Sequence, residues 1–468
     1  MEPFLTGSDH DRTGSYTYTG DRSDSKVKGC LDILTDLKEK VHSGQAQIGV
    51  IGLGYVGLPL ALAFMHAGFK VTGLDVSSRK IELLLSGKTD VEDVADHEIG
   101  DAVQNGGFKA TTDYSTLADQ DVVIICVPTP LSKTKDPDLS FIARAVEGLK
   151  KHLHAGQLIV LESTTYPGTT DELILPMLEE TGLKVGSDFF LAFSPERLDP
   201  GNTQYQMRSI PKIVGGITTA CCDIAALLYQ RIIDQIVPVS STRTAEMTKI
   251  LENTFRSVNI GLVNEIALIC DKLGVDVWET IEAAATKPFG YIPFYPGPGL
   301  GGHCIPIDPH YLSWKLKTLD YTTRFIALAS EVNSNMPYYV VSKVVDTLNE
   351  TEKSVKGSNI LVLGVAYKPN IGDIRESPAI DIIEILEEKG ANVSYHDPYI
   401  AEIALSGDKK MCSTDLTIDT LQRNDCVVIV TNHRLFDMNY IADQAQAIID
   451  TRNATKGLTA GQDKVTKL

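Results

Sequence analysis

A glycine-rich turn between an apolar run and a helical segment constrains the fold of this chain more than any other feature. Residues 47–51 form the apolar run, and residues 58–68 carry a helical pattern. Glycine occupies three positions of the turn between them, Gly52, Gly54 and Gly57. A short strand, a tight turn and a helix in this order predict the start of a βαβ unit in a parallel sheet.

The spacing of the three glycines predicts a turn that binds phosphate. A G-x-G-x-x-G turn lets the backbone approach a pyrophosphate at a helix N-terminus, where oriented N–H groups stabilise negative charge. The next strand, residues 70–75, ends in Asp75, which is placed to accept hydrogen bonds from ribose hydroxyls. Because a carboxylate there repels a 2′-phosphate, the pattern favours NAD over NADP, although the nearby Arg79 argues the other way. The alternative is a glycine turn selected for packing alone.

Apolar runs and helical patterns continue to alternate further along the chain. Residues 122–127 and 158–161 read as strands, and residues 138–152 read as a helix. Residues 242–273 are helical without a proline, which predicts a helix about 45 Å long at about 1.5 Å per residue. Such a helix can join two domains and offer a dimer surface.

The first pattern recurs near the C-terminus in a reduced form. Residues 356–366 read as a strand that contains Gly364, residues 378–389 as a helix, and residues 392–397 as a strand that ends in Asp397. Because the glycine fingerprint shrinks to Gly364, we expect no second dinucleotide, and a nucleotide of another kind stays open. The sequence therefore predicts an α/β fold with two Rossmann-like doubly wound domains joined by a long central helix.

Charge and composition argue against several classes of partner. The 468 residues carry a formal net charge of −18, which repels nucleic-acid phosphates, and we expect no nucleic-acid partner. No apolar run approaches the roughly 20 residues that span a bilayer, so we expect no membrane span. Residues 1–28 are polar without the pattern of a secretory signal, which indicates a disordered leader. The eight cysteines are scattered without a C-x-x-C pair, which favours a reducing, cytoplasmic location.

Cys304 follows a loop that is unusually rich in glycine and proline. Residues 293–302 contain four glycines and three prolines, which can shape the backbone around a ligand and present the next side chain rigidly. For the other cysteines we expect buried, inert side chains, whereas these polar surroundings indicate a reactive thiol at Cys304. His303, Asp308 and His310 lie close in sequence, but their spacing matches no zinc pattern, and we expect no metal.

Three polar side chains share one face of the long helix. Lys249 and Asn253 are four residues apart, and Arg256 lies on the next turn. A cation, an amide and a second cation could therefore point at one site. Taken alone, the pattern is more typical of a solvated helix face.

The ordered motifs together resemble the UDP-glucose/GDP-mannose dehydrogenase family, and in particular its UDP-N-acetylglucosamine 6-dehydrogenase branch. The resemblance runs from about Gln47 to the end of the chain. The segments that carry it are Gly52 to Pro59, Val127 to Pro130, Glu162 to Gly168, Ser194 to Gly201, Lys249 with Asn253, the Cys304 loop, and Tyr367 to Ser377.

The resemblance implies a four-electron oxidation in which a sugar C6 alcohol becomes a carboxylate and two NAD molecules are reduced in turn. Cys304 would add to the intermediate aldehyde, and the thiohemiacetal would give a second hydride and become a thioester that water cleaves. Lys249 and Asn253 would stabilise the oxyanions, and Asp308 would transfer protons with Lys249 and a water. Glu196 would act as the base in thioester hydrolysis, and Thr164 would position that water.

The resemblance also implies the residues that bind the two ligands. Those expected at NAD are Gly52, Gly54, Tyr55, Val56, Gly57, Asp75, Arg79, Thr129 and Arg375. Those expected at the UDP-sugar are Arg197, Leu198, Arg256, Gly297, Tyr367 and Lys368.

On this reading the chain has four parts. They are a disordered leader with a helical lead-in over residues 1–44, an NAD-binding Rossmann domain over 45–240, a central helical dimerisation domain with the cysteine loop over 241–335, and a Rossmann-like nucleotide-sugar (UDP)-binding domain over 336–468. The partners implied are a UDP-sugar and further copies of the chain, as a homodimer or a higher homo-oligomer.

Departures from the family pattern bear on the sugar. The UDP-glucose enzymes commonly carry Ser-Cys and Lys-Asp pairs, where this chain has His303 before Cys304 and Ile307 before Asp308, and Pro200 replaces their second acid. The first two differences favour an N-acetylhexosamine, whereas Pro200 bears on the share of thioester hydrolysis that falls on Glu196. Our first hypothesis is oxidation of UDP-N-acetylglucosamine for polysaccharide synthesis, followed by UDP-N-acetylmannosamine and UDP-glucose. A single-step hydroxyacid dehydrogenase and a non-catalytic nucleotide-sugar sensor are the alternatives of other kinds.

Overall fold

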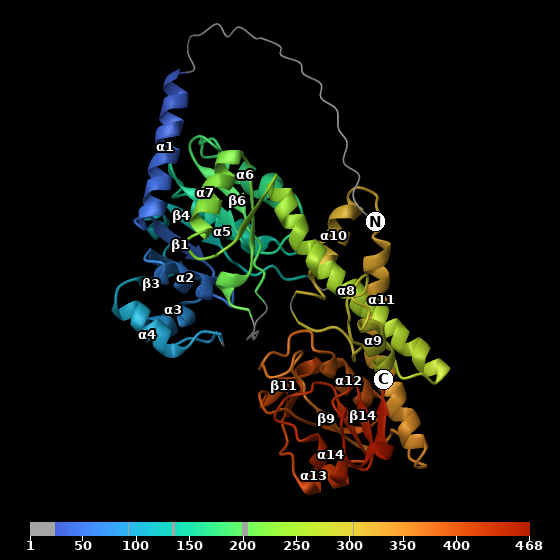
Figure 1. The fold of residues 1–468 in the computed structure, drawn as a ribbon. Helices are drawn as coiled ribbons and strands as arrows, with labels where there is room; N and C mark the ends of the chain where they lie inside the picture. The colour runs from blue at the N-terminus through green and yellow to red at the C-terminus, as the bar shows by residue number, and fades with distance from the viewer. Residues whose placement is uncertain (1–23, 92, 133–135, 199–204, 303) are drawn as a thin grey trace, which may run out of the picture.

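Two largely parallel sheets with their covering helices, and a pair of long helices, form the framework of the described part of the chain (Figure 1). The computed structural model describes residues 24–91, 93–132, 136–198, 205–302 and 304–468. The first 23 residues of the expected leader, His303 and Pro200 lie outside the described residues. Helix α1 (Asp24–Ser43) begins inside the stretch that we assigned to the leader and packs against α7.

The first sheet contains eight strands in the order β3-β2-β1-β4-β5-β6-β7-β8. Its pairs are parallel except for β6 with β7. The strand order reverses between β1 and β4, where Ile51 pairs with Leu74 on one side and Ile125 on the other. The crevice beyond the carboxyl ends of such neighbouring strands is where open α/β sheets bind ligands. The strands are β1 (Gln47–Ile51), β2 (Lys70–Leu74), β3 (Phe108–Thr111), β4 (Val122–Ile125), β5 (Leu158–Leu161), β6 (Phe190–Phe193), β7 (Lys212–Gly216) and β8 (Ile236–Val239).

Helices cover this sheet, so its central strands are buried on both sides. Every residue of β4, β5 and β6 is buried, which explains why these strands read as continuous apolar runs. Strands β2 and β4 end slightly earlier than their patterns indicate, at Leu74 and Ile125. The helices of this part are α2 (Gly57–His66), α3 (Ser78–Leu85), α4 (Asp96–Gln104), α5 (Ser140–Lys150), α6 (Leu175–Glu179) and α7 (Thr219–Tyr229).

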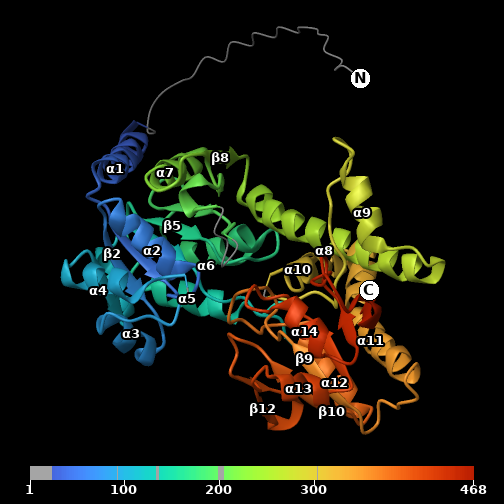
Figure 2. The same ribbon diagram turned by 60° about the horizontal axis from the view of Figure 1, so that its bottom comes forward.

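Helix α8 (Thr242–Leu273) has the bounds that the sequence predicts. The Ser241 hydroxyl accepts a hydrogen bond from the Thr244 N–H at 3.1 Å, and Gly274 ends the helix in a left-handed conformation. Helix α8 packs along α11 (Arg324–Asn349) and runs between the two sheet-containing parts (Figure 2). Two shorter helices complete this region, α9 (Val277–Ala285) and α10 (Asp308–Lys317).

The second sheet has five parallel strands in the order β10-β9-β13-β14-β15. The fold therefore has the two parallel α/β sheets and the long connecting helix that we expected. The strands are β9 (Asn359–Leu363), β10 (Asn392–His396), β13 (Cys426–Ile429), β14 (Ile448–Asp450) and β15 (Val465–Lys467), with a separate pair formed by β11 (Glu402–Ala404) and β12 (Lys410–Cys412). The helices are α12 (Pro378–Glu388), α13 (Ile418–Arg423) and α14 (Met438–Gln444).

Among the helices that the structure describes, none is both long enough and apolar enough to traverse a lipid bilayer.

Candidate active site

The glycine turn after β1 has the geometry that the sequence predicts, and each glycine serves a different purpose. Gly52 has φ +94°, and a Cβ there would lie 2.6 Å from the Cys126 carbonyl oxygen. A Cβ at Gly57 would lie 1.9 Å from the Gly52 carbonyl oxygen. A Cβ at Gly54 would meet no atom within 4 Å. The outer glycines are therefore required by the turn, whereas Gly54 leaves open space at the N-terminus of α2, where a pyrophosphate fits.

Asp75 follows β2 and fixes the same turn. Its carboxylate accepts hydrogen bonds from the N–H groups of Leu53 and Ser77, both at 3.0 Å. Asp75 is partly exposed, and each carboxylate oxygen keeps a lone pair that a ribose hydroxyl could use. Arg79 is exposed on α3. No sequence pattern pointed to Lys80, whose ammonium lies 3.4 Å from the Leu53 carbonyl oxygen and pairs with Asp90 at 2.7 Å.

The corresponding acid of the second sheet is fully occupied. Asp397 is 4% exposed, and its carboxylate accepts hydrogen bonds from four backbone N–H groups and contacts the ring of His433 at 3.0 Å. A ribose cannot reach a carboxylate in this position. Asp397 instead fixes the turn after β9, which explains why the second half keeps Gly364 without the rest of the dinucleotide fingerprint.

Helix α8 and the turn at the start of α10 bring four reactive groups together. They are the Lys249 ammonium, the Asn253 amide, the Cys304 thiol and the Asp308 carboxylate. Lys249 and Asn253 come from α8 and are 8% and 6% exposed, so this helix face is buried rather than solvated. The Asn253 amide donates to the Asp308 carboxylate at 2.5 Å, and the Lys249 ammonium donates to the Glu196 carbonyl oxygen at 2.7 Å. Arg256 lies one turn further along and is exposed. Burial raises the pKa of the Cys304 thiol, and the Arg256 charge is one of three cations that partly oppose that rise.

Cys304 and Asp308 are held in one turn at the start of α10. The Cys304 carbonyl oxygen accepts the Asp308 N–H at 2.8 Å. Burial and the Asp308 charge raise the pKa of the Cys304 thiol to about 11, although Lys249 lowers it. Burial also raises the pKa of Asp308 to about 6. In the ligand-free protein at neutral pH the thiol is therefore protonated, and the carboxylate beside it can accept a proton.

The loop before Cys304 is held from two sides. The Gly297 N–H donates to the Asn264 amide oxygen at 2.9 Å, and the Asn264 amide donates to Asn333 at 2.8 Å, which ties the loop to α8 and α11. On the other side, the Gly302 N–H donates to the Arg375 carbonyl oxygen at 3.0 Å. The two buried asparagines belong to no motif that the sequence revealed, because their pairing depends on how α8 and α11 pack.

The glycines of this loop allow close contact with the second sheet-containing part. A Cβ at Gly301 would lie 2.7 Å from the Tyr367 Cβ, and one at Gly297 would lie 2.6 Å from the Arg452 guanidinium. Burial lowers the pKa of Arg452 to about 10, despite the nearby Asp450. Arg452 is thus a second cation beside the loop, and no sequence pattern pointed to it.

Residues 365–377, here named the Tyr367 loop, connect the second part with the glycine turn. The Tyr367 N–H donates to the Asp373 carbonyl oxygen at 2.9 Å, and Arg375 pairs with the Asp373 carboxylate at 2.6 Å. The Arg375 guanidinium lies over the Tyr55 ring, 5.4 Å from its centroid. The loop that carries Tyr367, Lys368 and Arg375 therefore lies between the Cys304 loop and the glycine turn.

The residues after β6 are held by backbone and charge contacts. One Glu196 carboxylate oxygen accepts the N–H groups of Arg197 at 2.7 Å and Leu198 at 2.6 Å, and the other contacts the Lys212 ammonium at 3.3 Å. Arg197 pairs with Glu252 of α8 at 2.7 Å. No sequence pattern pointed to Lys212, a charged residue in the fully buried strand β7.

Thr164 and Thr129 follow β5 and β4. Thr164 is half-buried in a turn that Glu246 of α8 fixes by accepting the Gly168 N–H at 2.6 Å. The Thr129 carbonyl oxygen accepts a hydrogen bond from the Tyr311 hydroxyl of α10. Both turns are therefore anchored to the helices that carry Lys249 and Asp308.

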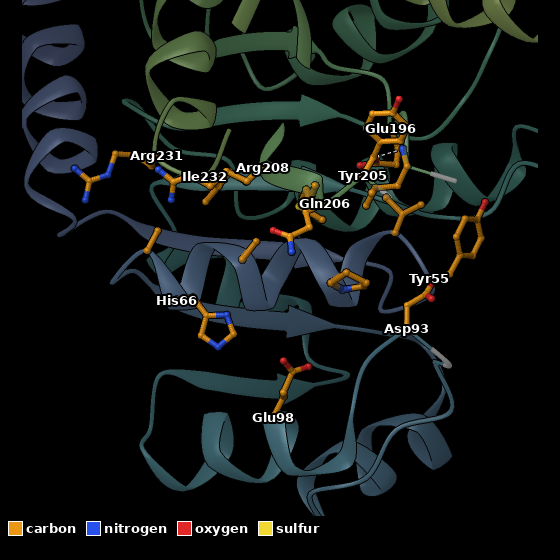
Figure 3. Close-up of a pocket in the computed structure, with 16 residues that line it drawn as sticks. Tyr55, His66, Asp93, Glu98, Glu196, Tyr205, Gln206, Arg208, Arg231 and Ile232 are labelled. Atoms are coloured by element: carbon orange, nitrogen blue, oxygen red, sulfur yellow. Dashed lines mark hydrogen bonds between the residues drawn. The ribbon is translucent and has the colours of Figure 1, made fainter. Parts of the chain in front are cut away.

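A cavity of about 730 Å³ opens beside the glycine turn. Four of the expected site residues line one end of it, namely Tyr55, Val56, Glu196 and Leu198. Figure 3 shows Tyr55 and Glu196 at this end, with Arg231 at the opposite end along α2. Within the described residues no group of His, Cys, Asp and Glu side chains is arranged to hold a metal ion, and His303 lies outside them.

Three family models match the chain in order. They describe the NAD binding domain of the UDP-glucose/GDP-mannose dehydrogenase family over residues 46–233, its central domain over 243–335, and its UDP binding domain over 361–457. The chain belongs to this family. It is an NAD-dependent nucleotide-sugar dehydrogenase, and the cofactor that the glycine turn and Asp75 predict is confirmed.

Named relatives act on more than one sugar. The dehydrogenase is 35% identical to the UDP-N-acetyl-D-mannosamine dehydrogenase of Pyrococcus horikoshii, over 88% of this chain and 96% of that protein. It is 36% identical to a UDP-N-acetyl-D-glucosamine 6-dehydrogenase of Pseudomonas aeruginosa, over 76% of this chain and 83% of that protein. The solved structure of the P. horikoshii enzyme matches with a TM-score of 0.81 and 35% identity, covering 90% of this chain and 98% of that one.

Proposed function

We propose that this dehydrogenase oxidises the C6 alcohol of UDP-N-acetylglucosamine to the carboxylate and reduces two NAD per sugar. The observation that carries the proposal is the turn that holds Cys304 against Asp308, with Lys249 and Asn253 directed at the same place. A two-electron alcohol dehydrogenase needs a base and an oxyanion donor but no thiol, whereas oxidation of an aldehyde to an acid needs a nucleophile that forms a hydride donor.

In the first oxidation, the Asp308 carboxylate accepts the proton of the C6 hydroxyl, directly or through a water. With a pKa of about 6 it is ionised at neutral pH and close enough to that pH to give the proton up again. The Lys249 ammonium and the Asn253 amide stabilise the alkoxide. Bound NAD supplies the hydride acceptor at both oxidations.

In the second oxidation, the Cys304 sulfur adds to the aldehyde carbon. Because the thiol has a high pKa in the ligand-free protein, it must lose its proton as it attacks, and Asp308 in the same turn is the acceptor. Lys249 and Asn253 stabilise the resulting oxyanion until a second hydride leaves and a thioester forms. Water, activated by Glu196 and positioned by Thr164, then cleaves the thioester.

UDP-N-acetylmannosamine is the second candidate substrate. It is favoured by the length of the match to the P. horikoshii relative, which covers 88% of this chain, against 76% for the P. aeruginosa relative. The two substrates differ only in the direction of one acetamido group.

The test measures NADH release with UDP-N-acetylglucosamine, UDP-N-acetylmannosamine, UDP-glucose and GDP-mannose. We expect the highest kcat/KM with UDP-N-acetylglucosamine and two NADH per sugar consumed. One NADH per sugar would contradict the proposed reaction, and a preference for another sugar would contradict only the substrate. Cys304→Ser should abolish formation of the acid, and a variant with full turnover would exclude Cys304 as the nucleophile.

We also propose how the molecule is divided and assembled. Residues 45–240 hold NAD, residues 241–335 supply Cys304 and a dimer interface, and residues 336–468 hold the UDP moiety.

An apolar stripe on α8 supports the proposed dimer interface. Its large apolar side chains are exposed at roughly heptad spacing on one helix, and a row of this kind marks a contact surface. These members, here named the α8 stripe, are Leu251, Phe255, Leu262, Ile269 and Leu273. The seven cysteines whose side chains the structure describes are free thiols, which supports a cytoplasmic location.

A further inference from the structure

A buried ion cluster includes the Glu196 carboxylate. The Lys212 ammonium lies 3.0 Å from the Glu162 carboxylate and 3.3 Å from the Glu196 carboxylate. The exposed fractions of these three side chains are 6%, 0% and 13%. Pairing with two carboxylates offsets the high cost of burying the Lys212 charge, so the cluster by itself is weak evidence of a stabilising role.

Glu162 serves as the fixed support of Lys212. The Tyr229 hydroxyl donates to the Glu162 oxygen that Lys212 does not contact, and the Lys212 ammonium also lies 5.0 Å from the Tyr229 ring centroid. Tyr229 is fully buried on α7, and Lys212 and Glu162 belong to β7 and the end of β5. Three rigid elements therefore determine where the ammonium points, before any contact with Glu196 is considered.

The position of the Glu196 carboxylate is consequently determined at both oxygens. Two backbone N–H groups hold one oxygen, and Lys212 holds the other. Burial alone would raise the pKa of Glu196, but the Lys212 charge and the two N–H groups lower it overall. The carboxylate stays ionised and points in one direction, next to the cavity that Tyr55 and Leu198 also line.

We propose that Lys212 is a positioning residue for thioester hydrolysis, because it orients the Glu196 carboxylate. Its charge also keeps that carboxylate ionised, and Glu162 and Tyr229 hold Lys212 in place. The inference rests on the role that the proposed function gives to Glu196. In the step concerned, a water oxygen bonds to the thioester carbon, Glu196 takes one proton of that water, and the bond to the Cys304 sulfur breaks. The sulfur leaves as a thiolate, and the sugar leaves as its carboxylic acid.

The pH dependence of this step reflects several groups that face Glu196. They come from different elements and comprise Lys212 of β7, Glu162 after β5, Lys249 of α8, Cys126 after β4 and Tyr55 of the glycine turn. Of the two cations, Lys249 contacts the Glu196 carbonyl oxygen, whereas Lys212 contacts the carboxylate. Loss of the Lys212 charge therefore raises the pKa of Glu196 most directly and should move the acid limb of hydrolysis to higher pH.

The test compares Lys212→Met with Lys212→Arg in the full-length enzyme supplied with NAD and UDP-N-acetylglucosamine. We expect hydrolysis to slow by about 100-fold in Lys212→Met, which is the usual contribution of a positioned base. Both hydrides should still be transferred in the first turnover, so intact-protein mass spectrometry should show an acylated protein, with the adduct on the Cys304 peptide. Lys212→Arg keeps the charge and should restore most of kcat, with little adduct.

Several outcomes would overturn the inference or the function beneath it. A Lys212→Met enzyme that slows without accumulating the adduct, or that keeps the wild-type acid limb, would show that Lys212 does not act through Glu196. If Lys212→Met does not fold, Lys212→Gln keeps the hydrogen bonds without the charge, and the same adduct is expected. A wild type that releases one NADH per sugar would contradict the proposed function itself, whereas two NADH with no adduct in the variants would contradict the Lys212 role alone.

Discussion

Cys304 and Asp308 lie one turn apart, and the Asp308 charge raises the cost of ionising the Cys304 thiol. The thiol has a pKa of about 11 and the carboxylate a pKa of about 6, and burial is the largest cause of both shifts. Lys249 acts in the opposite direction on both groups. Burial and the Asp308 charge favour a protonated sulfur in the ligand-free protein, whereas a reactive cysteine with a low pKa would be prone to oxidation.

Alkylation of Cys304 by iodoacetamide should therefore be slow in the ligand-free enzyme. At pH 8 a thiol of pKa about 11 is ionised in about one molecule per thousand. The rate should rise about tenfold for each pH unit up to about pH 10, because the thiolate is the reacting form. Peptide mass spectrometry would follow Cys304, with the exposed Cys412 as the internal reference. A rate at Cys304 that is fast and independent of pH between 7 and 9 would show that the thiol is already ionised.

Asn253→Ala should shift the pH dependence of turnover. The Asn253 amide donates to the Asp308 carboxylate and lowers its pKa, so removing the amide raises that pKa further. A base must be ionised to act, and activity of the wild type should therefore fall as the pH drops through about 6. In Asn253→Ala this acid limb should lie at higher pH, and the plateau should fall by about 100-fold because an oxyanion donor is lost. An unchanged limb in the kcat profile would mean that Asp308 is not the titrating base.

At the scale of elements, the two halves of the chain use one turn for two purposes. After β1, the turn keeps Gly54 free of neighbours and leaves Asp75 partly exposed. After β9, the equivalent acid Asp397 is buried, and its carboxylate is hydrogen-bonded to backbone N–H groups and to His433. The His433 ring accepts the Asn370 N–H at 2.9 Å, so the acid also anchors the Tyr367 loop. The first turn is thus built to bind a ligand and the second to position a loop.

Two alanine substitutions in the first turn should separate binding from folding. Gly54→Ala meets no neighbour, so the free energy of unfolding should change by less than about 0.5 kcal/mol. NAD affinity should nevertheless fall by at least about tenfold, a loss of about 1.4 kcal/mol, because the methyl group occupies the phosphate position. Gly57→Ala places its Cβ 1.9 Å from the Gly52 carbonyl oxygen and should destabilise the protein by about 1–3 kcal/mol.

Thermal unfolding and NAD titration of the purified Gly54→Ala and Gly57→Ala variants would check both expectations. Equal losses of stability would argue that the turn has no dedicated ligand space.

At the scale of the whole molecule, the candidate site forms where three parts meet. They are the part with the first sheet, the region of α8 and the Cys304 loop, and the part with the second sheet. The Cys304 loop contacts the Tyr367 loop through Gly302, and Arg375 of that loop reaches Tyr55 of the glycine turn. Helix α8 carries Lys249 toward the first part and Asn264 toward the Cys304 loop. Changes in how the parts are arranged would therefore alter catalysis without altering any catalytic residue.

The α8 stripe yields a prediction about assembly. Leu262 is 53% exposed in the middle of the stripe, and a charge there should oppose burial against a second copy. We expect the wild type to elute as a dimer or larger species and Leu262→Glu to shift toward the monomer. Leu435→Glu is the matched control, because Leu435 is 68% exposed but lies in a turn outside the α8 stripe. Size-exclusion chromatography with light scattering would decide, and a monomeric wild type would exclude the stripe as a dimer interface.

Local pattern was enough to predict much of this protein. The bounds of β1, β5 and α8 follow directly from apolar spacing and from terminal residues such as Gly274, because hydrogen bonds within an element depend on neighbours in sequence. The glycine turn, the acid that follows the next strand and the glycine-rich loop before Cys304 are also local. The family resemblance rests on the same short motifs, and for that reason the cofactor could be inferred from the sequence.

Only the tertiary structure decided which charges are buried and what they contact. Lys212 and Glu196 are adjacent through the antiparallel pairing of β6 with β7, and no spacing along the chain encodes that contact. The same holds for Arg452 beside Gly297 and for Asp397, whose role is opposite to that of Asp75 although both follow the second strand of a sheet. Sequence determined which groups can react. Burial and long-range pairing determined their pKa values and directions, because desolvation and charge act through space.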